Sequence, residues 1–378
     1  MAKLSKLEID AGRDVQERGL AARLHLDLPL LLFLLLLSAF GLLMLYSASG
    51  QSVVQVERQA IRLGLALLLM IAIAQLSPAL LRQWSAPLYL LGLGLLAAVL
   101  LFGEQSKGAQ RWLDLGILRF QPSEVLKLAL PMMLAWYLSL RPLPPRLLDI
   151  LLASILIALP VLMIAKQPDL GTALLVASAG LATLFLAGLR WRLILGLAAL
   201  AAAAAPLLWS LMHDYQRQRV LTFLDPGSDP LGAGYHIIQS QIAIGSGGLY
   251  GKGWLQGTQS QLEFLPERST DFIFAVIGEE LGLFGILALM LLYLAVILRG
   301  LIIAVQASDA YSRLLAGSVT MVFFVYLFVN MGMVTGLLPV VGVPLPLISY
   351  GGTSLVTLML GFGILMAVHT QRKSLQRE

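Results

Sequence analysis

Cysteine is absent from the chain, and charged residues are scarce. The 378 residues contain no cysteine, which excludes disulfides and zinc sites built on thiolates. Only 12% of the residues are charged and 58% are hydrophobic, a balance that indicates a membrane protein rather than a soluble one. The four histidines show no metal-ligand spacing, so no histidine metal site is expected; they are His25, His213, His236 and His369.

The hydrophobic residues occur in long blocks. A helix of about 18 or more nearly uncharged residues crosses about 30 Å of hydrocarbon and satisfies its own backbone groups. About ten such blocks are present, near 28–49, 59–77, 86–103, 122–140, 147–165, 170–189, 193–212, 271–298, 314–335 and 348–369. The sequence therefore predicts an all-α polytopic membrane protein, a bundle of about ten transmembrane helices. The first block is longer than the core of a signal peptide and is read as an uncleaved span.

Lysine and arginine predict the orientation. With a cytoplasmic N-terminus, the tails and loops on that side hold most of these residues, and the short loops opposite hold few, which places both termini in the cytoplasm. The expected organisation is a cytoplasmic tail over 1–27, one transmembrane domain over 28–369, and a cytoplasmic tail over 370–378. One large extracytoplasmic loop, about 213–270, lies between the seventh and eighth helices. The net charge of +5 follows from this topology; without a basic stripe interleaved with aromatics, no nucleic-acid partner is expected.

Several helices that begin at the external face carry unusual polar residues. Glu124 and Lys127 lie in the first turns of an apolar helix, three residues apart and thus on one face. Asp169 opens the next helix that begins on this side. Helix N-termini offer free amide donors and partial positive charge, which suits an anion such as a pyrophosphate. Two plainer interpretations stay open: ordinary helix capping for Asp169, and a buried ion pair that fixes packing for Glu124 with Lys127.

Asp271 stands at the expected boundary between water and lipid, just before a long apolar helix. A carboxylate there is within reach of solvent and of a membrane-bound molecule, and can accept a proton from an attacking hydroxyl. Helix capping is the alternative for Asp271. Deeper in the same helix, Glu279 and Glu280 predict pairing with a cation on a neighbouring helix, because lone ionised carboxylates in a membrane are unfavourable.

Glycine is dense between residues 226 and 257, but the spacing does not match a nucleotide-binding loop. Ser246 occupies the place of the first glycine and Gly253 follows Lys252 where such a loop needs Ser or Thr. No D-x-D motif is present to grip a metal-bound nucleotide sugar. No nucleotide, haem or flavin cofactor is therefore expected. The stretch LPLISYGGTS over 345–354 is interpreted as helix-breaking, which is tolerated at membrane depth beside protein or a polar cavity. A simple helix entry is the open alternative for Gly351 and Gly352.

Four motifs together resemble those of the SEDS family of shape, elongation, division and sporulation proteins. They are GAQRWLDLG with QPSEVLKLALP (108–131), KQPDLGT (166–172), the stretch from GYHIIQSQ to EELGLFG (234–285), and PLPLISYGGTS (344–354). The resemblance covers nearly the whole chain except the tails. The PVVGVPLPL stretch is more similar to the elongation branch than to the division branch.

The resemblance implies a bacterial peptidoglycan glycosyltransferase of the cytoplasmic (inner) membrane. Such an enzyme polymerises lipid II into β-1,4 glycan strands at the outer face, with inversion, during elongation and rod-shape maintenance. It implies Asp271 as the catalytic residue, with substrate-binding or supporting roles for Lys127, Glu124, Arg119, Asp169 and Glu263. It also implies a class B penicillin-binding protein transpeptidase as partner, and is compatible with a divalent cation, Mg or Mn, for which the sequence assigns no ligands.

Two other functions remain open at this point. A lipid II flippase needs a polar route through the bilayer midplane. The unusual charges of this chain instead cluster at external helix ends. A non-catalytic scaffold of the wall-synthesis complex would tolerate neutral substitutions at Asp271, Lys127 and Glu124.

Overall fold

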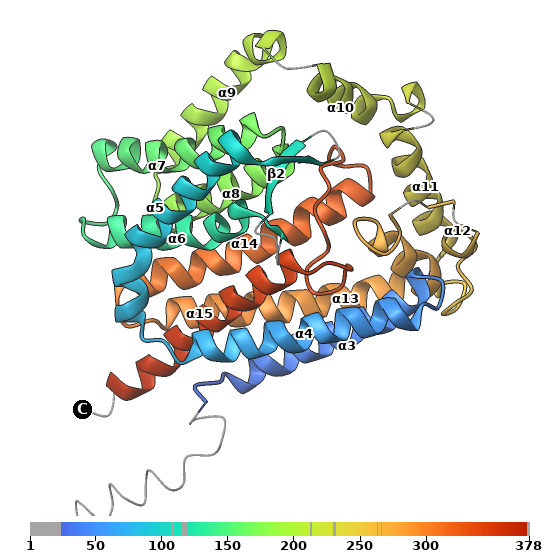
Figure 1. Cartoon of the computed structure of the whole chain (residues 1–378), viewed down its shortest axis with the longest axis horizontal. Helices are drawn as coiled ribbons and strands as arrows, with labels where there is room; N and C mark the ends of the chain where they lie inside the picture. Colours follow the sequence, from blue (N-terminus) through green and yellow to red (C-terminus); the bar gives the residue numbers. More distant parts are fainter. Residues whose placement is uncertain are drawn as a thin grey trace, which may run out of the picture.

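The computed structural model describes residues 24–106, 109–114, 119–211, 214–229, 232–262, 264–265 and 267–375. The described chain is dominated by helices (Figure 1). They are α3 (Leu28–Ala48), α4 (Val53–Ala74), α5 (Pro78–Phe102), α6 (Pro122–Ser139), α7 (Leu147–Lys166), α8 (Leu170–Leu186), α9 (Trp191–Leu211), α10 (Asp214–Leu224), α11 (Ala233–Ser246), α12 (Thr258–Gln261), α13 (Ile273–Val305), α14 (Ala310–Val334) and α15 (Thr353–Leu375), with a short 3₁₀ helix, Pro226–Ser228.

Every apolar block predicted from the sequence contains a helix. Within the described residues, six helices are long and apolar enough to cross a membrane: α3, α5, α7, α13, α14 and the Thr353–Thr370 part of α15. The chain is therefore a multi-pass membrane protein. Several predicted bounds were wrong: α4 and α5 begin earlier than predicted, α13 extends to Val305, and α15 begins at Thr353 and continues past 369 to Leu375. The late start of α15 agrees with the helix-breaking stretch over 345–354.

The all-α prediction missed one small antiparallel sheet. Strands β1 (Glu104–Ser106), β2 (Ala109–Asp114) and β3 (Arg119–Phe120) lie between α5 and α6 in the order β1-β2-β3. Leu113 pairs with Phe120 and Asp114 with Arg119. This segment leaves one helix and enters the next, and pairing as strands satisfies backbone groups that no helix here satisfies. The fold is therefore helical with one small three-stranded sheet.

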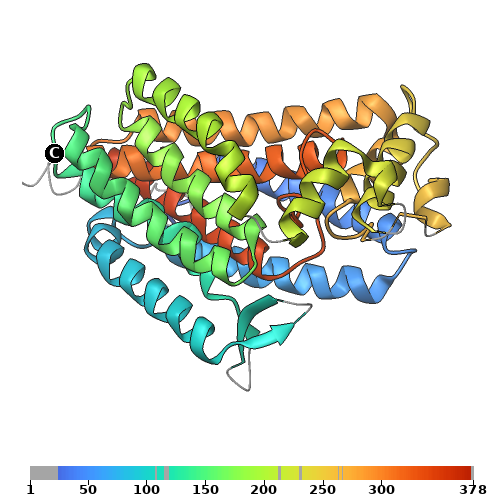
Figure 2. The ribbon, with the colours of Figure 1, turned by 90° about the horizontal axis from the view of Figure 1, so that it is seen from above.

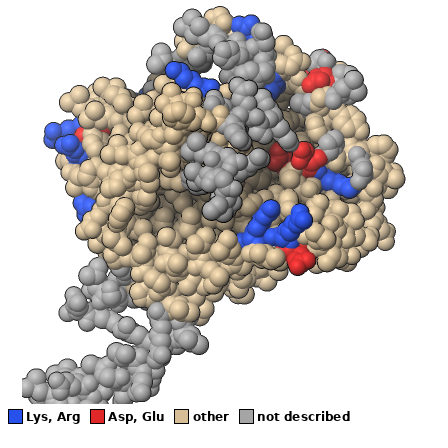
Figure 3. Space-filling view, in the orientation of Figure 1, with Lys and Arg blue, Asp and Glu red and all other residues tan. Residues whose placement is uncertain are grey.

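The long helices lie side by side, with α14 and α15 at the centre. In Figures 1 and 2, α3, α4, α13, α14 and α15 run along the long axis, and α4 packs along α15 and α13 along α14. The apolar windows of α14 and α15 are 72% buried, against 22–39% in the other four spans. The outer helices thus present apolar faces to lipid. On the face drawn in Figure 3, most described atoms likewise belong to uncharged residues.

The predicted external loop is largely helical rather than irregular. Between α9 and α13 the chain forms α10, the 3₁₀ turn, α11 and α12. Helices α11 and α12 lie at the end of the long axis opposite the C-terminus in both ribbon views (Figures 1 and 2). The N-terminal tail is described only from residue 24, so residues 1–23 of the predicted 1–27 tail lie outside the described part of the chain.

Helix α13 is kinked where the segment between α9 and α13 packs against it. We call this segment the external segment, after its predicted side of the membrane. Gly282 adopts φ +64°, and a side chain there would collide with the backbone of Gly251. The open turn exchanges hydrogen bonds with the external segment: Lys252 N donates to Glu279 O at 3.0 Å, and Leu283 N to Gly248 O at 3.0 Å. Glycine permits both the left-handed backbone and the close approach. The external segment is thus joined to α13 along the backbone.

Candidate active site

A cavity of about 380 Å³ lies among α6, α8, α10, α14 and the chain before α13 and α15. Its walls contain four of the six predicted site residues, Glu124, Lys127, Asp169 and Asp271. These residues come from three separate stretches of sequence. The fold therefore brings the QPSE, QPDL and TDF motifs to one place.

Glu124 and Lys127 form a buried ion pair in the wall of the cavity. Pro122 begins α6, and the two side chains follow one turn apart on one helical face. Lys127 Nζ lies 2.7 Å from Glu124 Oε1, and Thr357 Oγ1 of α15 donates to Glu124 Oε2 at 2.8 Å. Lys127 Nζ also lies 5.2 Å from the centre of the Tyr326 ring. The pair is thus the predicted packing contact and, at the same time, part of a cavity wall.

Asp169 caps α8, as the simpler interpretation of the sequence predicted. Its Oδ1 accepts from Thr172 N at 3.3 Å. Its Oδ2 accepts from Gln121 Nε2 at 3.2 Å, so Gln121, the first residue of QPSE, is linked to the aspartate of QPDL. Capping and cavity lining coincide at this carboxylate, because the N-terminus of α8 points at the cavity.

Asp271 does not cap the helix that follows it. Helix α13 begins at Ile273, its N-cap is Phe272, and no side chain caps it. Asp271 instead lies in the preceding turn, half-buried, and lines the cavity. A Cβ placed on Gly342 would lie 3.4 Å from Asp271 Oδ2, so the carboxylate lies against this loop. The capping interpretation was therefore wrong for Asp271.

Two predicted site residues remain, Arg119 and Glu263. Arg119 belongs to β3, which pairs with the strand that carries the cavity-lining Trp112. Glu263 lies outside the described residues. The prediction of their participation stays a prediction.

The sequence did not single out Arg219, which lines the same cavity from α10. Arg219 stands in a polar helix, DYQRQRVLTFL, with no motif around it. Arg219 and Lys127 line the same cavity because the chain folds back so that α10 and α6 both border it. The cavity wall thus combines two cations, Lys127 and Arg219, with three carboxylates.

His236 supports the turn beside Asp271 from α11. Its ring stacks on Phe272, with centroids 5.5 Å apart and planes 17° apart. Burial lowers the pKa of His236 below its ordinary value, and the nearby carboxylates of Glu267 and Asp229 oppose that shift. The neutral imidazole is therefore the form that packs on Phe272.

The cavity does not offer a ready metal site. Among the described residues, no three His, Asp or Glu side chains are grouped closely enough to hold an ion. Glu124 is already engaged by Lys127 and Thr357, and Asp169 by the Thr172 amide and Gln121. The described side chains therefore form no dedicated divalent-cation centre.

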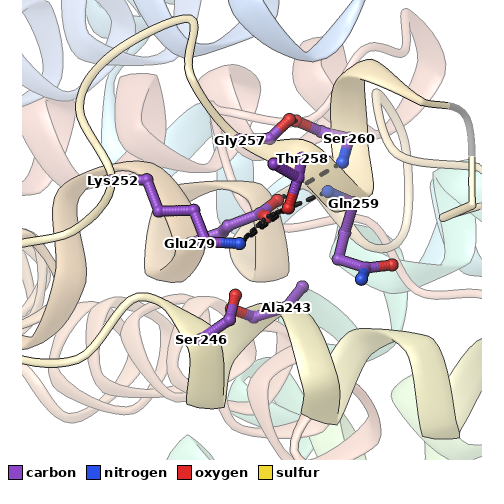
Figure 4. A network of polar contacts seen from close by, with 8 residues as sticks. All are labelled: Ala243, Ser246, Lys252, Gly257, Thr258, Gln259, Ser260 and Glu279. Carbon is purple, nitrogen blue, oxygen red and sulfur yellow. Dashed lines mark hydrogen bonds and ion pairs between the residues drawn. The ribbon is translucent and has the colours of Figure 1, made fainter.

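Glu279 and Glu280 lie outside the residues that line the cavity. Glu279 pairs with Lys252 at 2.7 Å and also accepts from Thr258 Oγ1, Gln259 N and Ser260 N (Figure 4). Glu280 accepts from Ser47 Oγ of α3 at 2.5 Å. The predicted partner was therefore wrong in part: the cation comes from the external segment rather than from a neighbouring helix. We call Lys252, Glu279 and the three residues 258–260 the loop network.

Sequence and structure comparisons place the chain among known proteins. The family model for FtsW, RodA and SpoVE, described as "Cell cycle protein", matches residues 27–374. The peptidoglycan glycosyltransferase MrdB of Escherichia coli K12 is 57% identical over 356 residues, 94% of this chain and 96% of that protein. A probable peptidoglycan glycosyltransferase FtsW of Geobacter metallireducens is 38% identical over 361 residues, 92% of this chain and 95% of the relative.

Solved structures agree with these relatives. A chain from a study of "Structural coordination of polymerization and crosslinking by a peptidoglycan synthase complex" is similar with a TM-score of 0.80 and 36% identity, over 92% of this chain and 98% of the other. The rod shape determining protein RodA of Thermus thermophilus gives a TM-score of 0.69 and 34% identity, over 92% and 97%. With a family match along nearly its full length, this chain belongs to the FtsW/RodA/SpoVE family of cell cycle proteins.

Proposed function

We propose that the protein is a peptidoglycan glycosyltransferase that polymerises lipid II into β-1,4 glycan strands during cell elongation. Its 57% identity to MrdB of Escherichia coli over nearly the whole of both chains supports the activity and the elongation role. The observation that carries the mechanism is the single cavity that Asp271, Lys127 and Arg219 share. A base and two cations around one space suit a sugar acceptor and a pyrophosphate leaving group.

The proposed reaction is a single displacement. The carboxylate of Asp271 takes the proton of the acceptor sugar's 4-hydroxyl while that oxygen attacks the anomeric carbon of the donor. The bond from this carbon to the pyrophosphate oxygen breaks, and the polyprenyl pyrophosphate leaves. Attack opposite the α-linked leaving group gives the β-1,4 bond with inversion and needs no glycosyl-enzyme.

The cations of the cavity stabilise the departing phosphates. Lys127 is positioned by Glu124, and Arg219 approaches from α10. Such preorganised charges act on the negative charge as it develops on the leaving group. We extend this phosphate-binding role to Arg119 of β3, and supporting roles to Glu124, Asp169 and Glu263. A divalent cation, Mg or Mn, remains a prediction from the family resemblance.

The proposed setting is the bacterial cytoplasmic (inner) membrane with ten spans. Helices α3 to α9, α13, α14 and α15 would cross, with both termini in the cytoplasm and residues 213–270 outside. The distribution of Lys and Arg, and the position of α11 and α12 opposite the C-terminus, support this orientation. Asp271 would then face the outer side, where lipid II is consumed.

The proposed partner is a class B penicillin-binding protein transpeptidase, which crosslinks the new strands. The support is the similarity to a chain from a peptidoglycan synthase complex that couples polymerisation to crosslinking. Lipid II, the lipid-linked glycan strand and membrane lipid are the other partners.

Replacement of Asp271 by Asn tests the mechanism. Purified Asp271→Asn protein should lose roughly 10²- to 10⁴-fold in lipid II polymerisation, because the amide cannot act as the base. Asp309→Asn is the matched control: Asp309 caps α14 through the Ser312 amide, away from the cavity, and asparagine also caps well. Polymerisation and lipid II translocation measured in the same proteoliposomes separate the enzyme from a flippase. Unchanged turnover of Asp271→Asn removes Asp271 from the base role, and retained function of all cavity variants would indicate a scaffold.

A further inference from the structure

The turn that carries Asp271 is held by three consecutive backbone carbonyls. Ser269 O accepts from Tyr350 N at 2.8 Å, Thr270 O from Ser349 Oγ at 2.5 Å, and Asp271 O from Asn330 Nδ2 at 2.8 Å. All three donors come from the other end of the chain, on α14 and the segment that leads into α15. The position of this turn is therefore set by tertiary contacts rather than by α13, which begins two residues later.

Asn330 connects this turn to a second segment of the cavity wall. Its side chain is fully buried on α14, and Nδ2 also donates to Val343 O at 2.7 Å. Both partners are carbonyl oxygens, which only accept, so they define which end of the amide is the donor. Asn330 Oδ1 has no hydrogen-bond partner among the described residues. The side chain thus serves as a double donor between two backbone segments.

The segment that Asn330 holds lies directly against the Asp271 carboxylate. Val340 to Pro344 line the cavity, and Gly342 among them has φ +71°. A Cβ on Gly342 would lie 3.4 Å from Asp271 Oδ2. One amide group therefore bonds both the turn that carries Asp271 and the segment that lies against its carboxylate.

We propose that Asn330, assisted by Ser349, is a positioning residue that holds the Asp271 carboxylate in register with the Val340–Pro344 wall of the cavity. Asn330 acts through Asp271 and does not itself contact the sugar substrates. The inference rests on the proposed role of Asp271 as the base. A misplacement of about 1 Å is enough to reduce turnover by about 10²-fold in well-positioned active sites.

The first experiment compares two substitutions on α14 in the purified full-length protein. Asn330→Leu keeps the approximate volume and removes both donors; we expect kcat for lipid II polymerisation to fall at least about tenfold, with KM within about threefold. Thr320→Val is the control, because Thr320 is equally buried but bonds only Ala316 O of its own helix, and kcat should stay within about twofold. Wild-type kcat for folded Asn330→Leu overturns the proposal.

A double-mutant cycle separates this inference from the proposed function. If Asn330 acts through Asp271, then Asn330→Leu added to Asp271→Asn should lower kcat by less than about twofold further. An equal loss in both backgrounds overturns the positioning role and leaves the base role of Asp271 intact. An unchanged kcat of Asp271→Asn alone overturns the base role.

Ser349 keeps the proposal testable if Asn330→Leu does not fold. Ser349→Ala removes the bond to Thr270 O and the one that Ser349 Oγ accepts from Leu345 N at 2.8 Å. We expect a loss of kcat of about threefold or more, restored by Ser349→Thr, which keeps the hydroxyl. Ser349→Ala with wild-type kcat, or Ser349→Thr as impaired as Ser349→Ala, contradicts the proposal.

Discussion

Two lysine–glutamate pairs in this protein have the same length and different surroundings. Lys127–Glu124 and Lys252–Glu279 both measure 2.7 Å. Glu279 is surrounded by donors, since it also accepts from Thr258, Gln259 N and Ser260 N and is fully buried. Among the described residues, Glu124 accepts one further hydrogen bond, from Thr357, and its pair lines a cavity. The Lys252–Glu279 pair, with its many hydrogen bonds, joins two segments of the chain. The Lys127–Glu124 pair instead lies in a cavity wall, where a ligand can reach the cation.

Among substitutions in the two pairs, Lys127→Met should produce the largest loss of polymerisation activity. The cavity loses a cation near the proposed leaving group, and Glu124 is left buried without its counter-charge, so polymerisation should fall by at least about 100-fold. The matched control is Lys252→Met in the loop network, where turnover per folded molecule should stay within about threefold. Equal activity losses in the two variants would remove the distinction between the pairs. Initial rates of lipid II polymerisation by purified protein provide the measurement.

Glu279→Gln should give the largest loss of stability with little direct effect on the reaction. The neutral amide leaves Lys252 without its partner and weakens the bonds from Gln259 N and Ser260 N, so unfolding should become easier by about 2–4 kcal/mol. Lys252→Met should cost less, about 1 kcal/mol, because the Lys252 side chain is 26% exposed and Glu279 keeps its hydrogen bonds from Thr258, Gln259 N and Ser260 N. Thermal unfolding in one detergent ranks the two. A Lys252→Met protein less stable than Glu279→Gln would show that the cation, not the carboxylate, organises the network.

His236 offers the smallest effect and a dependence on pH. Its pKa is lowered by burial below the ordinary value of 6.5, so the folded protein favours the neutral ring. Its contribution to stability is complete above about pH 6.5 and declines as the pH falls below that value, because the unfolded chain then binds the proton more tightly. Between pH 7.5 and 5.5 the Tm should fall further in the wild type than in His236→Phe, which keeps the stacking on Phe272. The same fall in both proteins would contradict this assignment.

Much of the fold follows from hydrophobic patterning. Every predicted apolar block contains a helix, because runs such as Leu28–Ala48 have no other way to satisfy their backbone groups in lipid. Helix ends were less predictable. The charges at Glu57 and Arg58 concealed the start of α4, which begins at Val53. The sheet between α5 and α6 contains no long apolar run that would have predicted it.

The site was predicted as a set of residues but not as an arrangement. Lys127 could be predicted because a cation inside an apolar helix is unusual. Asp271 could be predicted because it directly precedes a long apolar helix. Arg219, Asn330 and Thr357 carry no such signal, since each is an ordinary polar residue until its partner is known. The same limitation led to the wrong partner for Glu279, because Lys252 lies 27 residues away along the chain and meets it only through the kink at Gly282.

The sequence by itself determined that this chain is a multi-pass helical membrane protein, which stretches contain its long helices, and which charged residues stand near helix starts. These properties depend on the composition of contiguous segments, because each apolar segment must satisfy its own backbone groups in lipid. Only the tertiary structure decided that Asp271 does not cap α13, that Glu124, Lys127, Asp169 and Arg219 share its cavity, and that Asn330 bonds its turn. Those facts depend on hydrogen bonds and packing between residues far apart in the chain, whose pairing no local pattern specifies.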